Sequence, residues 1–152
     1  MIGLHLGSML GFGRPMWRVC ILLFVLLSID VATVAAADSS IHVELNAAES
    51  VPPNNCRLSF VVGNNAESAI DTLKLDLALF DREGAIQHRM IVEIGPVRAT
   101  KTIVRTFNVE TDCGHIGSIL LNDVTACAPG EPGACLDRLT LTSRTSTIRF
   151  YK

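Results

Sequence analysis

Leu73-Lys-Leu-Asp-Leu-Ala-Leu79 is the stretch of sequence that decides the fold. Leucine occupies every second position, and Lys74 and Asp76 stand between the leucines. A period of two places alternate residues on opposite faces of a β-strand, whereas a helix would scatter the same leucines around its circumference. The pattern therefore predicts a strand whose apolar face is buried in a protein core.

A turn follows this strand at Asp81-Arg-Glu-Gly84, where glycine can adopt the positive φ that a tight turn requires. A second alternating run begins directly after the turn and extends from Ile86 to Ile94. Two alternating runs separated by about four residues of turn type are typical of a β-hairpin. We therefore expect residues 73–94 to form a hairpin of two antiparallel strands.

Residues 1–37 have the features of a secretory signal peptide. Arg14 and Arg18 form a positive segment before an apolar run from Val19 to Leu27, and Ala35-Ala-Ala37 matches a cleavage site. We therefore expect residues 38–152 to be the mature exported protein, with no stable membrane anchor after cleavage.

An uncleaved membrane anchor is the alternative for this leader. Asp30 interrupts the apolar run before it reaches the ~20 residues that a membrane-spanning helix needs. Either Met1 or Met16 could be the first residue of the chain. The chain has no adjacent arginine pair, so the sequence does not specify the export route.

Four cysteines lie beyond residue 37, and an even number in an exported chain indicates disulfide bonds. Of the three possible pairings, we favour Cys56–Cys113 and Cys127–Cys135. The second pair is separated by eight positions around Pro129-Gly-Glu-Pro-Gly133, so a short loop closes easily. The first pair joins two cysteines that each share the register of apolar residues on a predicted strand, which places them near the core.

Short apolar or β-branched runs, separated by glycine, proline and asparagine, fill the rest of the chain. They give seven to eight expected strands and no convincing helix. The runs lie at residues 41–45, 56–62, 73–79, 86–94, 100–109, 115–126, 136–141 and 147–150. This pattern predicts an all-β fold, namely a single antiparallel β-sandwich of the immunoglobulin-like type. A small closed barrel is the alternative.

His88 and Met90 lie two positions apart on one face of a predicted strand, where they could present nitrogen and sulfur to copper. The same face carries Ile86, Val92 and Ile94, so the pair can equally fill the edge of the core. We therefore name His88 and Met90 as candidate metal ligands and expect no resident metal or cofactor.

Catalytic chemistry has little support in this sequence. No serine lies in a G-x-S-x-G elbow, no C-x-x-C pair exists, and the cysteines are expected to be oxidised. Carboxylates such as Asp76 and Asp81 are interpreted as solvated charges on strand faces and turns. Asn122-Asp123 interrupts an apolar strand, and we expect one side chain to bond loop backbone and the other to face water, with a ligand contact as the alternative.

Three segments carry a resemblance to known proteins: Leu73-Lys-Leu-Asp-Leu-Ala-Leu-Phe-Asp81, Gly95-Pro-Val-Arg-Ala-Thr-Lys101 and Leu120-Leu-Asn-Asp-Val-Thr-Ala-Cys127. There the chain resembles a group of small exported proteobacterial proteins with an automatic "Tat pathway signal sequence domain" label. The resemblance covers most of residues 41–151 and implies export and a compact β-domain, with no catalytic residues. The pattern of Gly63-Asn64, the leucine strand, Phe80-Asp81 and Gly84 is also similar to FxLYD-type immunoglobulin-like modules.

The formal net charge of −2 argues against a phosphate-binding surface, so nucleic acid is not an expected partner. We expect a periplasmic or secreted, non-enzymatic β-sandwich that binds an envelope protein or another ligand. The alternative is a periplasmic metal- or small-ligand-binding protein that uses His88 and Met90 or the Asn122-Asp123 strand. The last residues, Arg149-Phe-Tyr-Lys152, could form an edge strand that adds to a partner's sheet, or could pair within their own sheet.

Overall fold

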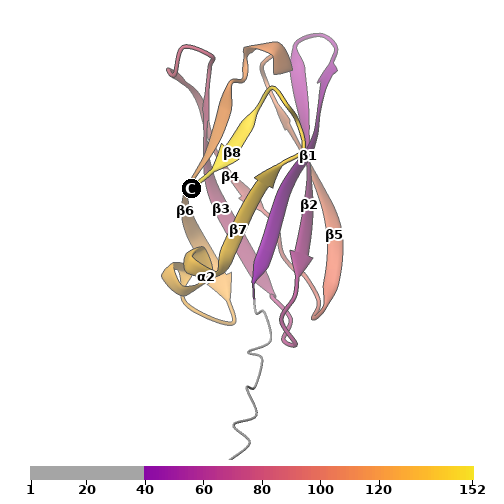
Figure 1. Ribbon diagram of the computed structural model, residues 1–152, viewed down its shortest axis with the longest axis vertical. Helices are drawn as coiled ribbons and strands as arrows, with labels where there is room; N and C mark the ends of the chain where they lie inside the picture. The colour runs from indigo at the N-terminus through magenta and orange to yellow at the C-terminus, as the bar shows by residue number, and fades with distance from the viewer. Residues whose placement is uncertain (1–39) are drawn as a thin grey trace, which may run out of the picture. The chain divides into compact units, whose positions relative to one another are not determined.

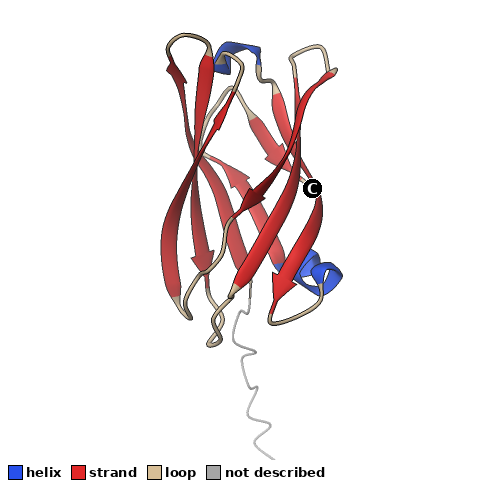
Figure 2. Ribbon diagram, turned by 180° about the vertical axis from the view of Figure 1, so that it is seen from behind, coloured by secondary structure: helices blue, strands red, loops and turns tan. Residues whose placement is uncertain are grey.

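The computed structural model describes residues 40–152, so the expected leader at residues 1–37 lies outside the described residues. Strands run along the body of this part of the chain, and short helical segments lie at its two ends (Figure 2). The elements are β1 (Ile41–Val51), β2 (Asn55–Asn64), β3 (Thr72–Phe80), β4 (Ile86–Glu93), β5 (Lys101–Val109), the 3-10 turn η1 (Cys113–His115), β6 (Ser118–Ala128), α2 (Pro132–Arg138), β7 (Leu139–Ser143) and β8 (Arg149–Tyr151).

The eight strands form two four-stranded sheets that pack face to face (Figure 1). The first sheet has the order β5-β2-β1-β7, and the second has the order β4-β3-β6-β8. The expectation of an all-β fold with two packed sheets is therefore confirmed.

The expectation of a purely antiparallel sandwich is wrong, because β7 runs parallel to β1 and β8 runs parallel to β6. The chain crosses from the second sheet to the first through α2, so β7 starts at the end where β1 starts and runs beside it. The following turn returns the chain to the second sheet, where β8 takes the direction of β6. Both sheets are therefore mixed.

The predicted leucine hairpin is present. The four leucines of β3 are at most 1% exposed, and β3 pairs antiparallel with β4. Gly84 has a φ of 88° in the connecting turn, and the Asp81 carboxylate accepts the Ala85 backbone N–H at 2.8 Å. Local turn chemistry and the period of two therefore agree, which explains why this part of the chain could be predicted.

The interior between the sheets is filled by aliphatic side chains from both layers. Phe60 of β2 and Phe150 of β8 meet edge to face at 5.5 Å between ring centroids, so the last strand contributes to the same core as the second. The expected central strand of residues 115–126 is confirmed as β6, which lies between β3 and β8.

Two local expectations are wrong. β1 was expected to end at residue 45, but it continues to Val51 across a register shift beside Asn46, which breaks the period of two. Residues 132–138 form the short helix α2, which begins inside the expected disulfide loop and replaces the start of the strand expected at 136–141, so that β7 begins at Leu139. Pro132 suits the first turn of a helix, and seven residues are too few to show a helical period.

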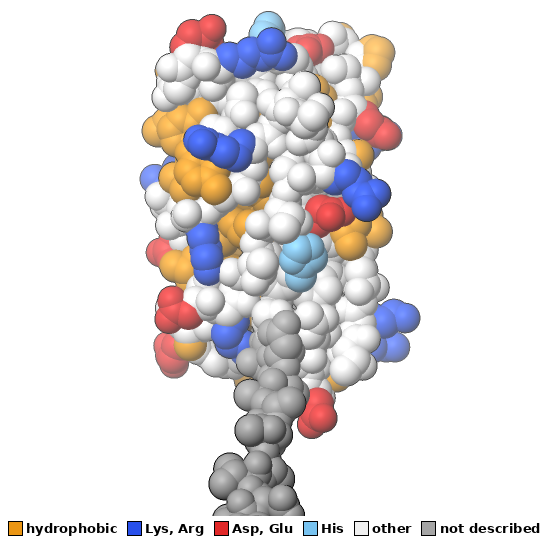
Figure 3. Space-filling model, in the orientation of Figure 1, with side chains coloured by type: hydrophobic (Ala, Val, Ile, Leu, Met, Phe, Trp, Pro, Cys, Tyr) orange, Lys and Arg blue, Asp and Glu red, His pale blue; other side chains and the backbone are white. Residues whose placement is uncertain are grey.

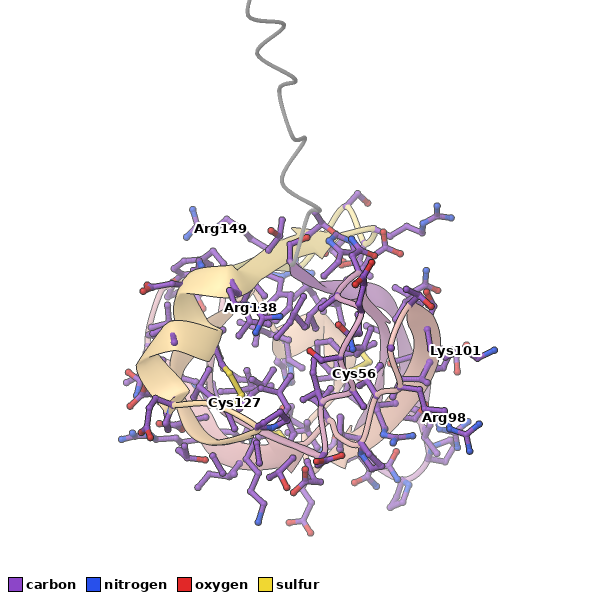
Figure 4. All side chains as sticks on the ribbon, turned by 90° about the horizontal axis from the view of Figure 1, so that it is seen from below. Cys56, Arg98, Lys101, Cys127, Arg138 and Arg149 are labelled. Carbon is purple, nitrogen blue, oxygen red and sulfur yellow. A yellow bond between two sulfur atoms is a disulfide. The ribbon has the colours of Figure 1, made fainter. Side chains whose placement is uncertain are left out.

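The structure contains two disulfide bonds, Cys56–Cys113 and Cys127–Cys135, which are the two pairs that the sequence favoured. The first ties β2 to η1, and the second ties β6 to α2, beside which it lies in Figure 4. Two disulfides indicate an oxidising, non-cytoplasmic environment. Within residues 40–152, no helix is both long and apolar enough to cross a membrane.

Candidate functional site

A buried carboxylate on the outer face of the second sheet is the least expected polar feature of the described residues. Asp76 lies between two core leucines of β3, so its side chain points away from the core. It is nevertheless only 4% exposed. The expectation that Asp76 is a solvated charge is therefore wrong, and its partners must compensate for the loss of water.

Arg89 of β4 covers the Asp76 carboxylate. Its Nε donates to Oδ1 at 3.0 Å and to Oδ2 at 3.2 Å, and its Nη2 donates to Oδ2 at 2.5 Å. The register pairs Arg89 with Ala78, so the arginine reaches its carboxylate diagonally across the hairpin. The arginine side chain is 66% exposed, so one partner is buried and the other is presented to solvent.

Asn122 of β6 supplies the remaining bond, because its Nδ2 donates to Asp76 Oδ2 at 2.8 Å. The register between β3 and β6 shifts at this point, so that Asn122 is an extra residue opposite Asp76 and Leu77. A β-bulge of this kind turns two successive side chains to the same side of the sheet. Asn122 and Asp123 are both exposed as a result, while Leu121 is buried.

The bulge explains the polar pair in an apolar strand. Within the part of the chain that the structure describes, neither Asn122 nor Asp123 has a side-chain bond to a loop backbone, contrary to our expectation. Asn122 bonds a carboxylate across the sheet, and Asp123 accepts the backbone N–H of the next residue, Val124, at 2.8 Å. Asp123 does face water, as one of the two was expected to do.

The hydrogen bonds from Arg89 lower the pKa of Asp76 below its ordinary value. Burial acts in the opposite direction, and the bond from Asn122 lowers the pKa further. The carboxylate therefore stays ionised at neutral pH and holds the guanidinium in one orientation. An arginine fixed in this way can present its planar donor group to an incoming carboxylate without losing much further conformational freedom.

Two isoleucines of β4 share the outer face with Arg89. Ile91 lies two positions further along the strand, and a register shift at Gln87 places Ile86 opposite Phe80, so the expectation that Ile86 shares the face of His88 is wrong. Ile86 is 65% exposed and Ile91 is 62% exposed, and both belong to the few large apolar side chains that face solvent. A shallow hollow of about 380 Å³ lies beside Ile91 and is lined by Asp76, Arg89, Met90, Ile91 and Thr125. We call the set of Asp76, Arg89, Asn122, Ile86 and Ile91 the outer-face site.

The candidate metal ligands lie on the other side of β4. His88 and Met90 stand opposite core leucines in the register, both are half-buried, and Met90 packs against the core. Met90 also lines the hollow described above, whereas His88 does not. Within residues 40–152, no three side chains of His, Cys, Asp or Glu gather in a way that could hold a metal ion. Copper binding by His88 and Met90 stays a prediction.

A second hollow, of about 360 Å³, lies at one end of the sandwich between the 81–84 turn and η1. It is lined by side chains of both charges, including Asp81, Arg82 and Glu83. The Asp81 carboxylate is already used to hold the turn, because it accepts from the Ala85 backbone and from Gln87. This hollow therefore offers less for binding than the outer-face site.

Figure 3 shows the side of the molecule on which β1, β7 and β8 are turned toward the viewer. Basic and acidic side chains are interspersed on it, and neither sign gathers in one place. It gives no electrostatic reason to place a charged ligand there.

Sequence reasoning missed Asp76 and Arg89 as partners. The signal was present in the hairpin register, because a turn at 81–84 brings residue 89 beside residue 78 and diagonal to residue 76. What could not be seen was the contribution of Asn122, which comes from 46 positions further along the chain. Only the fold brings β6 against β3.

No family model matches the chain, and no curated protein matches it. Among solved structures, the chain is similar to IrmA from Escherichia coli, with a TM-score of 0.49 and 16% sequence identity. The similar part covers 67% of this chain and 90% of that chain. A TM-score of 0.49 and an identity of 16% are too low for this likeness to say anything about function.

Proposed function

We propose that this chain is an exported, non-enzymatic β-sandwich protein of the periplasm or the secreted fraction, which binds a partner of the cell envelope through its outer-face site. The observation that carries the proposal is Arg89, held by the buried Asp76 carboxylate and flanked by two isoleucines that are more than 60% exposed. Arginine beside exposed apolar area is a composition enriched in protein interfaces.

The chemistry of the site favours a partner surface that offers a carboxylate next to an apolar side chain. The guanidinium uses Nε and Nη2 for Asp76, so Nη1 can bond a second carboxylate. Ile86 and Ile91 supply apolar area on either side of the arginine. A shallow and open site suits a protein surface better than a small molecule, which binds in deeper and more enclosed pockets.

Two observations support a non-enzymatic role. The only buried carboxylate reported among residues 40–152 is ion-paired and has a lowered pKa, so it is a poor general base at neutral pH. The four cysteines of this part of the chain are bonded in disulfides, so none supplies a thiolate nucleophile.

We also propose that the sandwich is immunoglobulin-like. In that fold the two central strand pairs are B with E in one sheet and C with F in the other. Here β2 pairs with β5, and β3 pairs with β6, which is the same arrangement in chain order. The parallel strands β7 and β8 then form an additional closing element, one on each sheet.

The test is site-specific photo-crosslinking of the exported protein in an extract of its own cell envelope. A crosslinker at Ile91 should capture a discrete protein, and Arg89→Met should abolish that product. The matched controls are Lys74→Met, which changes an exposed ion pair on the same hairpin, and a crosslinker at Val104, which is 60% exposed on the other sheet. Capture that is equal at both positions, or that survives Arg89→Met, would contradict the proposal.

A metal or small-ligand site is the second candidate function. The observation that favours it is that His88 and Met90 lie two positions apart on one side of β4, both half-buried, with Met90 lining the hollow beside Asp76. Equilibrium dialysis with Cu(I) should then give one bound ion per chain, which His88→Ala should remove. The absence of binding to the native protein would end this alternative.

A further inference from the structure

Among residues 40–152, β4 is an open edge of the second sheet, because β3 is the only strand of this range that pairs with it. The backbone N–H of Ile94 donates to the carbonyl of Leu73 on β3 at 2.8 Å. Since backbone groups alternate in direction along a strand, Val92 and Met90 also point their N–H and C=O groups toward β3. The backbone groups of Arg89, Ile91 and Glu93 therefore point outward from the sheet.

The part of this edge from Arg89 to Glu93 has few of the features that prevent strand pairing, because the β-bulge of β4 lies before it, at Gln87. Proteins protect an exposed edge with proline, with lysine, or with a charged side chain directed inward. The edge of the first sheet has such protection, because Arg105 of β5 stands opposite the core residue Phe60 and donates to the carbonyl of Ile94 at 2.9 Å. On β4 the inward positions are His88, Met90 and Val92, and the strand contains no proline.

The side chains of Arg89, Ile91 and Glu93, the residues whose backbone groups point outward, are complementary to the same side chains of a second copy. If two copies pair antiparallel about a two-fold axis at Ile91, Arg89 of one copy stands opposite Glu93 of the other, and the two copies of Ile91 face each other. An axis at Arg89 would oppose two arginines, and an axis at Glu93 would oppose two carboxylates, which is destabilising in a sheet. The charge pattern therefore selects one register.

Pairing about an axis at Ile91 also satisfies the backbone N–H and C=O groups of the edge. Residues that face each other across an antiparallel pair must direct their N–H and C=O groups toward each other in order to exchange both hydrogen bonds. Arg89, Ile91 and Glu93 are the residues whose groups point outward, and the axis at Ile91 pairs them only among themselves. This pairing gives about six backbone hydrogen bonds. Backbone direction alone allows several axes along β4, and only the axis at Ile91 places opposite charges against each other.

We propose that the chain forms a two-fold symmetric dimer through its β4 edge, with Ile91 on the axis, so that the two second sheets join into one continuous sheet. A single strand pairing buries little surface, so the dimer belongs to the weak, concentration-dependent class. The dimer places the two outer-face sites side by side. The inference goes beyond the proposed function and needs no envelope partner, since it is tested on the purified chain alone.

The first test is sedimentation equilibrium of the chain as purified after export, over a series of concentrations up to the millimolar range. The native chain should shift from one chain mass to two. Ile91→Lys places two like charges on the axis and should raise the dimer dissociation constant by about tenfold or more. Because the Ile91 side chain is 62% exposed, the fold should tolerate the change, which circular dichroism checks.

The matched controls are Val104→Lys on β5 and Ile86→Lys, which lies on β4 but beyond the paired segment. Their native side chains are 60% and 65% exposed, so all three substitutions add the same charge at positions of similar exposure. Both controls should dimerise like the native chain. A native chain that remains monomeric throughout, or a loss of dimer that is equal in Val104→Lys, would overturn the proposal.

Amide hydrogen exchange tests the register without relying on any variant. The N–H groups of Arg89, Ile91 and Glu93 have no partner strand in the monomer, so they should exchange more slowly as concentration rises. The amides on the open side of β5, the other long edge strand, should not change with concentration. Protection that appears on β5, and not at these three amides, would show that a different edge makes the contact.

Discussion

Replacing Asp76 by asparagine tests whether the ion pair on the outer face behaves as a buried interaction. The substitution keeps the shape of the side chain and removes its charge. Three donor–acceptor contacts from Arg89 and one from Asn122 converge on this carboxylate. Hydrogen bonds to a charged group contribute about 1.5–3 kcal/mol. Since the guanidinium is largely exposed and can be rehydrated, we expect Asp76→Asn to lower the free energy of unfolding by about 2 kcal/mol at pH 7.

Asp123→Asn is the matched control. Asp123 stands directly opposite Asp76 in the register between β3 and β6, and the substitution changes net charge by the same amount. Its carboxylate is exposed and accepts only from the neighbouring backbone N–H. We expect its effect to stay within about 0.5 kcal/mol, which is usual for an exposed surface position.

The pH dependence has a defined sign. The pKa of Asp76 is lower in the folded protein than the value of about 3.9 in an unfolded chain, so ionisation stabilises the fold. This contribution is complete above that unfolded value and is lost as pH falls through the folded pKa. The difference between the native protein and Asp76→Asn should therefore be constant near neutrality and should shrink below about pH 4.

The assay is equilibrium denaturation in urea with both disulfides intact, followed by far-ultraviolet circular dichroism. Circular dichroism is needed because the only tryptophan, Trp17, lies in the expected leader. Measurements at two protein concentrations separate any contribution from association. Most of the loss should disappear when Arg89→Met is already present. Equal losses for Asp76→Asn and Asp123→Asn, or a difference that does not change with pH, would refute the reasoning.

Three further predictions concern the fold. Replacing Cys56 and Cys113 together by alanine opens a loop of 57 residues and should cost about 4 kcal/mol, whereas opening the eight-residue loop of the other disulfide should cost about 2.5 kcal/mol, as measured by urea denaturation. Gly117→Ala should destabilise by about 1–3 kcal/mol, because its Cβ would lie 2.5 Å from the Asp81 carbonyl oxygen at the start of the 81–84 turn, while an added Cβ at Gly133 in α2 has no neighbour within 4 Å, so Gly133→Ala should stabilise slightly in thermal melts. Asn64→Ala should cost about 2–4 kcal/mol, since this buried amide donates to three backbone carbonyls and accepts one N–H; a loss below 1 kcal/mol would show that these loop contacts are dispensable.

The parts of the fold that could be predicted from the sequence are those in which local signals agree. The leucines of β3 alternate without a break, Gly84 has the positive φ that its turn requires, and the next apolar run begins two residues later. Nothing outside the hairpin is needed to specify it. Where a bulge interrupts the alternation, as beside Asn46, the sequence pattern ends although the strand continues.

The direction of the last strands depends on the connection rather than on the strands themselves. A short apolar run such as Leu139–Ser143 reads the same whether its neighbour is parallel or antiparallel. The helix α2 decides the outcome by carrying the chain from the second sheet to the first. Its seven residues are too few to show a helical period, so mixed sheets could not be predicted.

Arg105 is a second residue whose role could not be predicted from the sequence. In the sequence it interrupts an apolar register, which is consistent either with an inward ion pair or with a bulge. In the structure it donates to the carbonyls of Ile94, Gly95 and Pro96, which belong to the connection between the two sheets. The partner of an inward-directed charge is a backbone segment, and such a partner leaves no mark on residue type.

An ion pair with one buried partner is an inefficient way to stabilise the outer face of a sandwich. Desolvating Asp76 costs free energy that the bonds from Arg89 must first offset, and an apolar pair of similar volume would hold the two strands at least as well. What an apolar pair cannot provide is a guanidinium of fixed orientation at the centre of an exposed face. The core already contains leucines from the same strand, so stability alone gives no reason for a carboxylate at position 76. We infer that this carboxylate serves to orient Arg89, and that the arginine, rather than the ion pair, is what the outer face presents to other molecules.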